Sequence, residues 1–381
     1  MRIAIDIRNI GKKRTGDEAV FSNLVRNFAE LDSKNKYYLF IDSRSEEALE
    51  KMRTDLGING SNNFKMIPLG SGNKFVWNFW TVQRRLRKHP VDIYLTQYIT
   101  PFFVPRKIKI ATIIHDVSFI VFPELIRKRD LLFLRMLIPL SIKRADKVIG
   151  VSEFTKREIV KYFKTEPKKV AWMHNAVSDG FIKELESLSE DDKEEAVRKF
   201  DLPEKFILYI GTLQPRKNIP LLIEAFAKAK DRLDGAKLVL AGGKGYNYDA
   251  RIDSAIEKNC LESEVIMPGF VGEKDKAALM SLASCVCSPS LYEGFGIPVL
   301  EGFVAGVPVV ASRIPPHEEI SGGTAVLFDP ADAAELSRDL VRIMSDEKLR
   351  ASVVKNEKER AGLFSWKSSA EKVLEIFRSM G

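Results

Sequence analysis

The stretch SPSLYEGFGIPVLEGFVAGVPVVAS, residues 288 to 312, is the part of the sequence that decides the fold. It places two carboxylates, Glu293 and Glu301, around the turn Gly294-Phe295-Gly296, ahead of an apolar run that predicts a strand. Pro298 suits a first helical position, so we predict a helix from Pro298, with Glu301 in its first turn and Glu293 on the preceding loop. Glycines let the backbone approach a ligand closely, and free amides at a helix start stabilise an anion. We expect a phosphate at this helix mouth.

The length and composition of the chain limit the classes it can belong to. With 381 residues, 45% of them hydrophobic, two domains are a better expectation than one. No apolar run reaches the roughly 18 residues of a membrane span, and the start MRIAIDIRN predicts a buried strand rather than a signal peptide. The three cysteines, Cys260, Cys285 and Cys287, lack metal spacing, which favours reduced thiols in a cytosolic protein.

The net charge of +8 is unevenly distributed along the chain. Residues 1 to 190 hold 34 Lys and Arg against 22 Asp and Glu, whereas residues 191 to 381 hold 26 against 30. The densest basic cluster, residues 84 to 88 (RRLRK), follows the aromatic segment WNFW at 77 to 80. This basic and aromatic segment suggests an anionic membrane surface as a partner. The alternative explanation is a partly buried helix with a solvated charged side. Nucleic acid is not a predicted partner, because no recognised nucleic-acid motif occurs.

Strand and helix patterns alternate in both halves of the chain. The predicted strands are residues 2–7, 37–41, 92–95, 108–114 and 147–151, then 206–210, 237–241, 265–267, 285–287 and 307–311. Helical patterns cover residues 20–30 and 219–230, the region near 252, and segments starting at 274 and 298. This alternation predicts an α/β protein with two doubly wound domains, residues 1–182 and 196–363, that face a shared cleft. The acidic stretch 183–195 is predicted as a linker, or as a linker followed by a short helix.

The loop after the predicted strand 206–210 carries two adjacent cations, Arg216 and Lys217. Asn218 is predicted to cap the helix that follows. A helix start already favours anions, so two cations there suggest that a diphosphate arrives, and a pair of solvated surface charges is the alternative. The sequence contains neither Walker A spacing nor GxGxxG, which disfavours an ATPase or a dehydrogenase.

Over nearly its whole length the chain resembles the retaining glycosyltransferases of family four, which have the GT-B architecture. The block with Glu293 and Glu301 looks like the Glu-x7-Glu signature of that family, and residues 211–226 are similar to its phosphate segment in the form common among mannosyltransferases. Further matching blocks are residues 114–124, 145–159 and 364–377. The resemblance implies two Rossmann-like domains, the first binding the acceptor and the second the nucleotide-sugar. It also implies that the C-terminal helix, residues 364–381, crosses back onto the first domain.

The implied reaction is hexosyl transfer from a nucleotide-sugar to an acceptor, with retention at the anomeric carbon and with no metal or other cofactor. The sequence is consistent with a reaction without a metal, since no Asp-x-Asp follows a strand and the four histidines show no ligand spacing. We favour mannose from GDP-mannose as the donor, with a UDP-sugar as the alternative. The expected acceptor is a glycan or a lipid-linked oligosaccharide of cell-envelope polysaccharide synthesis. The expected location is the cytoplasm, with a peripheral position at the inner face of the membrane as a variant.

The resemblance also implies roles for individual residues. The predicted catalytic set is His115, Arg216, Lys217 and Glu293: His115 contacts the transferred sugar, the two cations neutralise the leaving diphosphate, and Glu293 holds sugar hydroxyls. The predicted donor-binding positions are Gly16, Gly211, Thr212, Phe270, Val271, Gly294, Phe295, Gly296 and Glu301, of which Glu301 accepts from the ribose hydroxyls.

Three points stay open at the level of sequence. Thr212 stands where the family often carries arginine, so the role of Arg216 is inferred from its neighbouring position. Asp17 and Glu18 put acid beside Gly16, which leaves the loop 11–20 with either a donor or an acceptor role. Asp116 either orients the imidazole of His115 or caps the following loop. A sugar-nucleotide epimerase and a non-catalytic nucleotide-sugar-binding protein are the rival functions.

Overall fold

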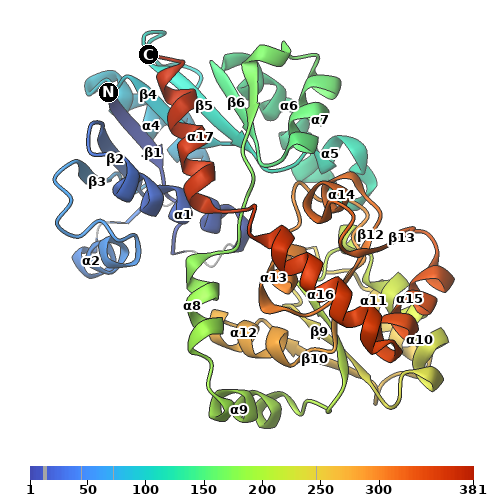
Figure 1. Cartoon of the computed structure of the whole chain (residues 1–381). Helices are drawn as coiled ribbons and strands as arrows, with labels where there is room; N and C mark the ends of the chain where they lie inside the picture. The colour runs from blue at the N-terminus through green and yellow to red at the C-terminus, as the bar shows by residue number, and fades with distance from the viewer. Residues whose placement is uncertain (12–14, 44, 72, 246) are drawn as a thin grey trace. The chain divides into compact units, whose positions relative to one another are not determined.

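The computed structural model describes residues 1–11, 15–43, 45–71, 73–245 and 247–381, and the chain divides into two compact units. The N-terminal unit consists of Met1–Val121, Lys128–Asn175 and Ser365–Gly381. The C-terminal unit consists of Phe122–Arg127 and Ala176–Phe364. Each unit has its own parallel sheet with helices packed on it, which is the doubly wound α/β arrangement that the alternating pattern predicts (Figure 1).

The sheet of the N-terminal unit has seven strands in the order β3-β2-β1-β4-β5-β6-β7. The strands are β1 (Arg2–Asp6), β2 (Lys36–Ile41), β3 (Phe64–Pro68), β4 (Ile93–Gln97), β5 (Lys109–Ile114), β6 (Lys147–Gly150) and β7 (Val170–Trp172). Every neighbouring pair is parallel, and the central strands β1, β4 and β5 are almost entirely buried. Strands covered on both faces need apolar residues at successive positions, which is why sequences such as RIAID and KIATII do not alternate.

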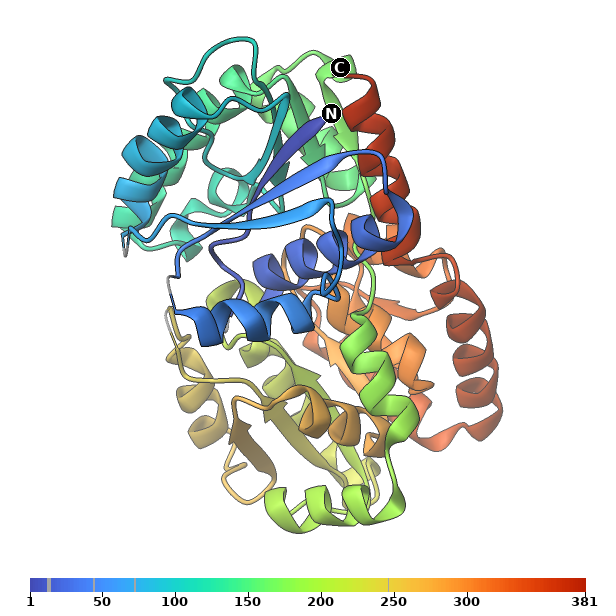
Figure 2. The same ribbon diagram turned by 90° about the vertical axis from the view of Figure 1, so that its left-hand side faces the viewer.

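Helices connect and cover these strands. They are α1 (Thr15–Leu31), α2 (Glu46–Asp55), α3 (Lys74–Val76), the π-helical turn η1 (Trp77–Thr81), α4 (Val82–Lys88), α5 (Ser118–Val121), α6 (Lys128–Arg144), α7 (Glu153–Phe163) and the 3-10 turn η3 (Pro167–Lys169). The last helix of the chain, α17 (Trp366–Arg378), packs on α1, where the rings of Phe28 and Phe377 lie 5.9 Å apart. The predicted return of the C-terminal helix to the first domain is therefore confirmed. Both chain ends lie close together in this unit (Figure 2).

The sheet of the C-terminal unit has six parallel strands in the order β10-β9-β8-β11-β12-β13. The strands are β8 (Phe206–Ile210), β9 (Lys237–Ala241), β10 (Val265–Gly269), β11 (Cys285–Ser288), β12 (Val309–Ser312) and β13 (Val326–Phe328). The helices are α8 (Asp179–Ser187), α9 (Glu190–Phe200), α10 (Ile219–Ala229), α11 (Arg251–Lys258), α12 (Glu273–Leu282), α13 (Ile297–Ala305), α14 (Pro315–Ser321), α15 (Ala333–Ser345) and α16 (Glu347–Ala361), with 3-10 turns η2 (Pro123–Leu125), η4 (Pro215–Lys217) and η5 (Lys230–Arg232). Their apolar faces share one core with the sheet, in which Leu222, Phe226 and Leu340 are fully buried.

The structure differs from the sequence pattern at the sheet edges and at the acidic stretch. The strands β3, β7 and β13, which the pattern missed, all lie at the edge of a sheet. Edge strands have one neighbour only and carry a weaker apolar signal, as in FKMIP. The stretch 183–195, predicted as a linker or as a linker followed by a short helix, lies largely in α8 and α9 of the C-terminal unit. Ser178 and Ser189 cap these helices, and Asp192 completes a capping box. No helix in the described ranges is long and apolar enough to cross a membrane.

The strand order fixes where loops can meet in the C-terminal unit. From β8 the chain winds outward through β9 and β10 on one side, and through β11, β12 and β13 on the other. The point between β8 and β11 is therefore the topological switch of this sheet. In doubly wound sheets, ligands bind beyond the carboxyl ends of the strands at such a switch.

Candidate active site

The loops that follow β8 and β11 are bonded to each other at this switch point. The amide of Leu291 donates to the carbonyl of Arg216 at 2.9 Å, and the guanidinium Nη1 of Arg216 donates to the carbonyl of Tyr292 at 2.5 Å. Because β8 and β11 are neighbouring parallel strands, their carboxyl ends bring these loops side by side. Residues almost eighty positions apart in the chain thus form one site.

Glu293 lies at the centre of the site, where it pairs with both predicted cations. Its Oε2 accepts from Arg216 Nη1 at 2.9 Å and its Oε1 from Lys217 Nζ at 2.5 Å. Ser290 also donates to Oε1, at 2.7 Å. The side chains of Glu293, Lys217 and Arg216 are 10%, 12% and 19% exposed. The sequence predicts that these three residues act together, and in the structure Glu293 lies within hydrogen-bonding distance of both cations.

Glu293 is an ionised carboxylate in this arrangement. Burial by itself would raise its pKa, but the charges of Lys217 and Arg216 outweigh burial, and hydrogen bonds from Lys217 and Ser290 add to them, so the pKa lies well below its usual range. An ionised carboxylate can accept hydrogen bonds from sugar hydroxyls and can stabilise positive charge on a sugar ring. It has no proton to give, which excludes it as a general acid.

Glu301 is the second carboxylate of the site and has its own cation. Lys276 on α12 donates to Glu301 Oε1 at 2.7 Å and also lies 3.1 Å from Glu273. Burial would lower the pKa of Lys276, but the charges of Glu301 and Glu273 outweigh it and the pKa is raised. Within the described residues, Lys276 is the one side chain that donates to Glu301, so the carboxylate keeps acceptor capacity for a ligand hydroxyl.

The predicted start of the helix between the two glutamates is wrong by one residue. The helix α13 begins at Ile297 with Gly296 as its N-cap, so Pro298 takes the second position. Glu301 consequently lies in the second turn, and the first turn carries no acid. Gly296 has φ +116°, a conformation that side chains disfavour. A Cβ there would also lie 3.0 Å from the ring of His317.

His317 is a site residue that the sequence reasoning did not single out. It lies on α14 just after β12, is fully buried, and its Nδ1 contacts the carbonyl of Ser312 at 3.0 Å. Burial lowers the pKa of His317 to about 4, although Glu293 and Ser312 act in the opposite direction. The imidazole is therefore neutral near pH 7. Its position after a strand end was the available signal, and the same holds for Lys276 and Ser290, which follow β10 and β11.

The remaining predicted donor-binding residues of this unit line neighbouring strand ends. Gly211 and Thr212 follow β8, and the Tyr209 hydroxyl donates to the carbonyl of Thr212 at 2.7 Å. A Cβ on Gly242, after β9, would lie 2.0 Å from the Gly211 carbonyl oxygen, so these loops touch through their backbones. After β10, the Phe270 side chain is 62% exposed beside Gly243, and Val271 is half-buried.

Two other predictions need correction or restriction. Asn218 stands at the N-cap position of α10 but does not cap it, because its side chain donates to the carbonyl of Pro330 at 3.0 Å and its φ is +55°. Phe295 is buried and packs edge-on against Phe364 with ring centres 5.8 Å apart. Its ring is packed inside the protein, so a donor could meet Phe295 only through its backbone.

His115 and Gly16 belong to the N-terminal unit. His115 follows β5, and its Nε2 lies 2.7 Å from the side-chain oxygen of Gln97 at the end of β4, which is the contact expected when Nε2 carries a proton. Asp116 caps the following loop by accepting from the backbone amide and hydroxyl of Ser118 at 2.9 and 2.6 Å. Gly16 is the second residue of α1 and is exposed. Of the predicted loop 11–20, residues 12–14 lie outside the described residues.

The chain is similar to known proteins in both of its units. The family described as Glycosyltransferase Family 4 matches residues 16–180, and the family described as Glycosyl transferases group 1 matches residues 190–360. The chain is 27% identical over 281 residues to the O-antigen chain mannosyltransferase B of Escherichia coli, which covers 73% of this chain and 72% of that protein. It is 29% identical over 239 residues to the serotype-specific mannosyltransferase WbdA of Escherichia coli, covering 62% of this chain but only 29% of WbdA.

A solved structure shares the fold over the full length. HepE of Anabaena, crystallised in complex with UDP and glucose, superposes with a TM-score of 0.75 at 18% identity and covers 100% of both chains. At this identity the likeness concerns the fold, which is GT-B. The two family matches together take in both units and nearly the whole chain. The chain therefore belongs to the family-four, group-one glycosyltransferases.

Proposed function

We propose that this protein is a retaining, metal-independent mannosyltransferase that uses GDP-mannose to extend a glycan or a lipid-linked acceptor in cell-envelope polysaccharide synthesis, at the cytoplasmic side of the membrane. The observation that carries the proposal is the cluster of Arg216, Lys217 and Glu293 at the switch point beside the mouth of α13. The relatives named as O-antigen and serotype-specific mannosyltransferases support mannose as the sugar.

The cations would act on the leaving group. As the bond between sugar and diphosphate breaks, negative charge grows on the phosphate oxygens, and preorganised donors aimed at those oxygens lower the barrier. Arg216 would grip phosphate oxygens with its planar fork, Lys217 would supply a compact charge, and the backbone amides of Gly294 to Gly296 would add donors. These groups would take over the charge neutralisation that a divalent ion provides in other enzymes.

The carboxylates would hold the two ends of the donor. Glu293 would accept from the hydroxyls of the transferred sugar, and its ionised state would favour the positive charge that develops on the ring. Glu301 would accept from the ribose hydroxyls while Lys276 fixes its position. The bond from the anomeric carbon to the phosphate oxygen breaks and the bond to the acceptor oxygen forms on the same face. The proton of the acceptor hydroxyl passes to the leaving phosphate, so no covalent glycosyl-enzyme is required.

The test is a donor panel with purified full-length protein. Release of nucleoside diphosphate is measured with GDP-mannose and several UDP-sugars, with acceptor glycans present or omitted, and with or without a chelator. We expect acceptor-dependent release of GDP that the chelator leaves unchanged. Turnover that the chelator abolishes would contradict metal independence, and conversion of the donor without an acceptor would indicate an epimerase. Binding without any turnover would indicate a sensor. A UDP-sugar is the second candidate donor, because HepE was crystallised with UDP and glucose.

Variants of the two cations test the assignment of residues. Arg216→Ala and Lys217→Ala should each lower kcat by about 10² to 10³, the effect of removing one oxyanion donor. Lys228→Ala is the matched control, since Lys228 is a 49% exposed cation of the same unit that pairs with Glu224 on its own helix. Normal turnover in both cation variants would remove Arg216 and Lys217 from the mechanism.

A further inference from the structure

The imidazole of His115 is held by the end of the neighbouring strand rather than by the acid beside it. Asp116 accepts from Ser118 and so caps the following loop. The group on the ring is Gln97, the last residue of β4, whose Oε1 lies 2.7 Å from Nε2 of His115. Because β4 and β5 are neighbouring parallel strands, their carboxyl ends bring these two side chains together.

The backbone after Gln97 is strained. Tyr98 has φ +53°, which is an outlier for a bulky side chain. The amide of Ile99 donates to the carbonyl of Gln97 at 2.6 Å, so Tyr98 is the central residue of a three-residue turn, a rare and strained form when φ is positive. The amide of Tyr98 donates to the carbonyl of Ile113 at 3.0 Å, which keeps the turn attached to β5. Such strain persists only where the surrounding structure imposes it, and it clusters at functional sites.

The turn brings two consecutive side chains to the same imidazole. In an extended strand, successive side chains point to opposite faces of the sheet. Here Gln97 contacts Nε2 of His115, and the ring of Tyr98 lies 5.3 Å from the imidazole centre at an angle of 35°. Gln97 is 8% exposed, so its side chain has little freedom to move away. The strained turn therefore accounts for both the hydrogen-bond partner and the plane of the His115 ring.

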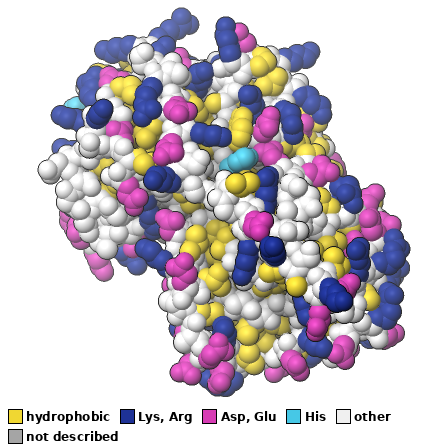
Figure 3. Space-filling model, viewed as in Figure 1, with side chains coloured by type: hydrophobic (Ala, Val, Ile, Leu, Met, Phe, Trp, Pro, Cys, Tyr) yellow, Lys and Arg dark blue, Asp and Glu magenta, His cyan; other side chains and the backbone are white. Residues whose placement is uncertain are grey.

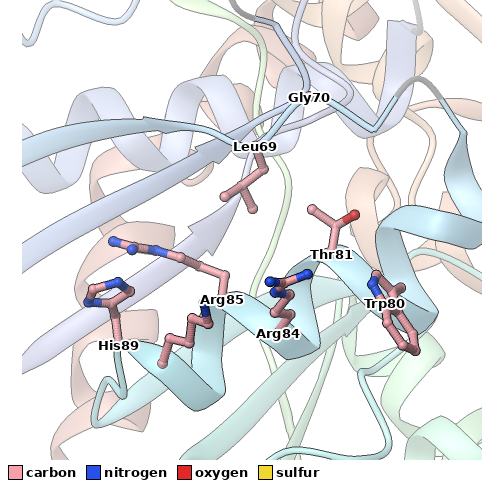
Figure 4. Close-up of a pocket in the computed structure, with 8 residues that line it drawn as sticks. Leu69, Gly70, Trp80, Thr81, Arg84, Arg85 and His89 are labelled. Atoms are coloured by element: carbon pink, nitrogen blue, oxygen red, sulfur yellow. The ribbon is translucent and has the colours of Figure 1, made fainter.

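The other concave feature of this unit lacks such strain. A pocket of about 370 Å³ lies between Leu69, after β3, and Arg84 and Arg85 of α4 (Figure 4). Cations are favoured in the last turn of a helix, and basic side chains lie among acids over the whole face in Figure 3, so charge alone does not distinguish this pocket. Its one lining residue with a positive φ is Gly70, and glycine adopts that conformation readily.

We propose that Gln97 is a positioning residue that keeps the proton of His115 on Nε2, so that Nδ1 accepts a hydrogen bond from a hydroxyl of a sugar ligand. The inference rests on the proposed function, in which the ligand is a sugar. An amide oxygen accepts and does not donate, so it selects the ring nitrogen that carries the proton. A carboxylate in this place would add a negative charge and favour a charged ring, whereas glutamine fixes the tautomer without adding charge. His115 thereby acts toward the sugar as an acceptor.

The experiment follows the ring nitrogens of ¹⁵N-labelled full-length protein by NMR and does not require turnover. The chain has four histidines, and the signals that are missing in His115→Asn identify the ring. In the neutral ring we expect the protonated, pyrrole-type signal at Nε2 and the unprotonated, pyridine-type signal at Nδ1. GDP-mannose should move the Nδ1 signal, because a hydrogen bond to that lone pair changes its shielding. A proton on Nδ1, or an Nδ1 signal that GDP-mannose leaves in place, would overturn the proposal.

Variants of Gln97 test its role in the same spectra. Gln97→Leu removes the acceptor at similar volume, so the ratio of the two neutral tautomers should change about tenfold, the equivalent of one hydrogen bond. Gln97→Glu retains an acceptor oxygen and should keep the proton on Nε2. Gln97→Met serves as a second variant without an acceptor, and thermal melting verifies that each variant folds.

Gln83→Leu is the matched control for these variants. Gln83 is a buried glutamine of the same unit that bonds to the backbone of Asn78 and Phe103. Its loss should leave the His115 signals unchanged. Unchanged tautomers in both Gln97→Leu and Gln97→Met, or an equal change in Gln83→Leu, would contradict a positioning role for Gln97.

Turnover gives an independent readout. With GDP-mannose as the donor, Gln97→Leu should lower kcat about tenfold, and Gln97→Glu should recover part of that loss. A normal kcat in Gln97→Leu despite a changed tautomer would contradict the acceptor role of Nδ1. Absence of turnover in the parent protein would count against the proposed function, whereas the tautomer spectra would still decide the role of Gln97.

Discussion

The two units differ in whether the cations that line their pockets are paired with an acid. In the C-terminal unit, Arg216 and Lys217 share the carboxylate of Glu293 at 2.9 and 2.5 Å. In the N-terminal unit, Arg84 and Arg85 line a pocket without any carboxylate partner among the described residues. The first arrangement holds its cations in place before a ligand arrives, which is what preorganised electrostatic catalysis requires. The second leaves the partly buried charge of Arg85 without a neutralising partner among the described residues, which costs free energy.

The strongest test of this contrast is Glu293→Gln. The amide keeps the shape of the side chain but removes the charge that neutralises Arg216 and Lys217. We expect kcat/KM to fall by about 10² to 10³ and the free energy of unfolding by about 3 to 5 kcal/mol, as when one partner of a buried pair is removed. Initial rates and urea unfolding measure the two effects. Glu224→Gln, which breaks an exposed pair with Lys228, should change stability by less than about 0.5 kcal/mol. Equal stability of Glu293→Gln and the parent protein would show that the cluster is not held by charge.

Glu357 is a buried acid of the same unit that pairs with no cation among the described residues, and it should show the opposite pH response. Burial raises the pKa of Glu357 to about 9, and only the amide of Val309 acts against it. Between pH 4.5, which is the ordinary pKa of the group, and about pH 9, the folded state therefore binds one more proton than the unfolded state. Stability is full below the lower value and declines as pH rises through the window, on the order of 6 kcal/mol in total.

The measurement is the melting temperature between pH 5 and pH 9, a window taken from that raised pKa. Glu357→Gln should flatten the decline, and Glu359→Gln, an exposed neighbour on the same helix, should leave it unchanged. A parent profile without alkaline decline would mean that Glu357 is solvated or paired in solution.

Gly296→Ala tests whether the geometry of the helix mouth supports the paired cluster. Alanine would have to adopt φ +116° with its Cβ 3.0 Å from His317, so we expect a loss of about 1 to 3 kcal/mol in unfolding free energy. Gly180→Ala on α8 is the control, because it has no close contact and should be neutral or slightly stabilising. Donor affinity should fall in the first variant only. Unchanged stability and affinity would mean that the turn tolerates a side chain.

The smallest expected effect is that of Arg85→Met on stability. No partner is lost and a partly buried charge is removed, so the free energy of unfolding should change by no more than about 0.5 kcal/mol, or rise. Arg216→Met should lower it, because Glu293 loses one of its two cations. Chemical denaturation of both variants gives the comparison. A clear loss of stability in Arg85→Met would reveal a partner for Arg85 and remove the contrast between the two units.

Much of the fold could be predicted because its central strands are apolar at successive positions. Strands such as β8 and β9 were placed within a residue, since burial on both faces dictates their composition. The edge strands β3, β7 and β13 were missed, because a strand with one neighbour is less covered and carries a weaker apolar signal. The acidic stretch, predicted as a linker or as a linker followed by a short helix, lies largely in two helices, and α9 fits the short helix of the second alternative. Its composition is that of an exposed surface, whereas its capping serines act locally.

The sequence by itself determined the two doubly wound sheets, because periodicity records them, and the residue types of the candidate site, because local motifs record them. The return of the last helix was implied only by the resemblance to a known family. Tertiary structure alone decided the pairings. Glu293 meets cations some seventy-five positions earlier, and His317 contacts Gly296. The cations of α4 meet no acid in the described chain. Such pairings depend on which strands become neighbours, and strand order is a property of the folded sheet that spacing along one chain does not encode.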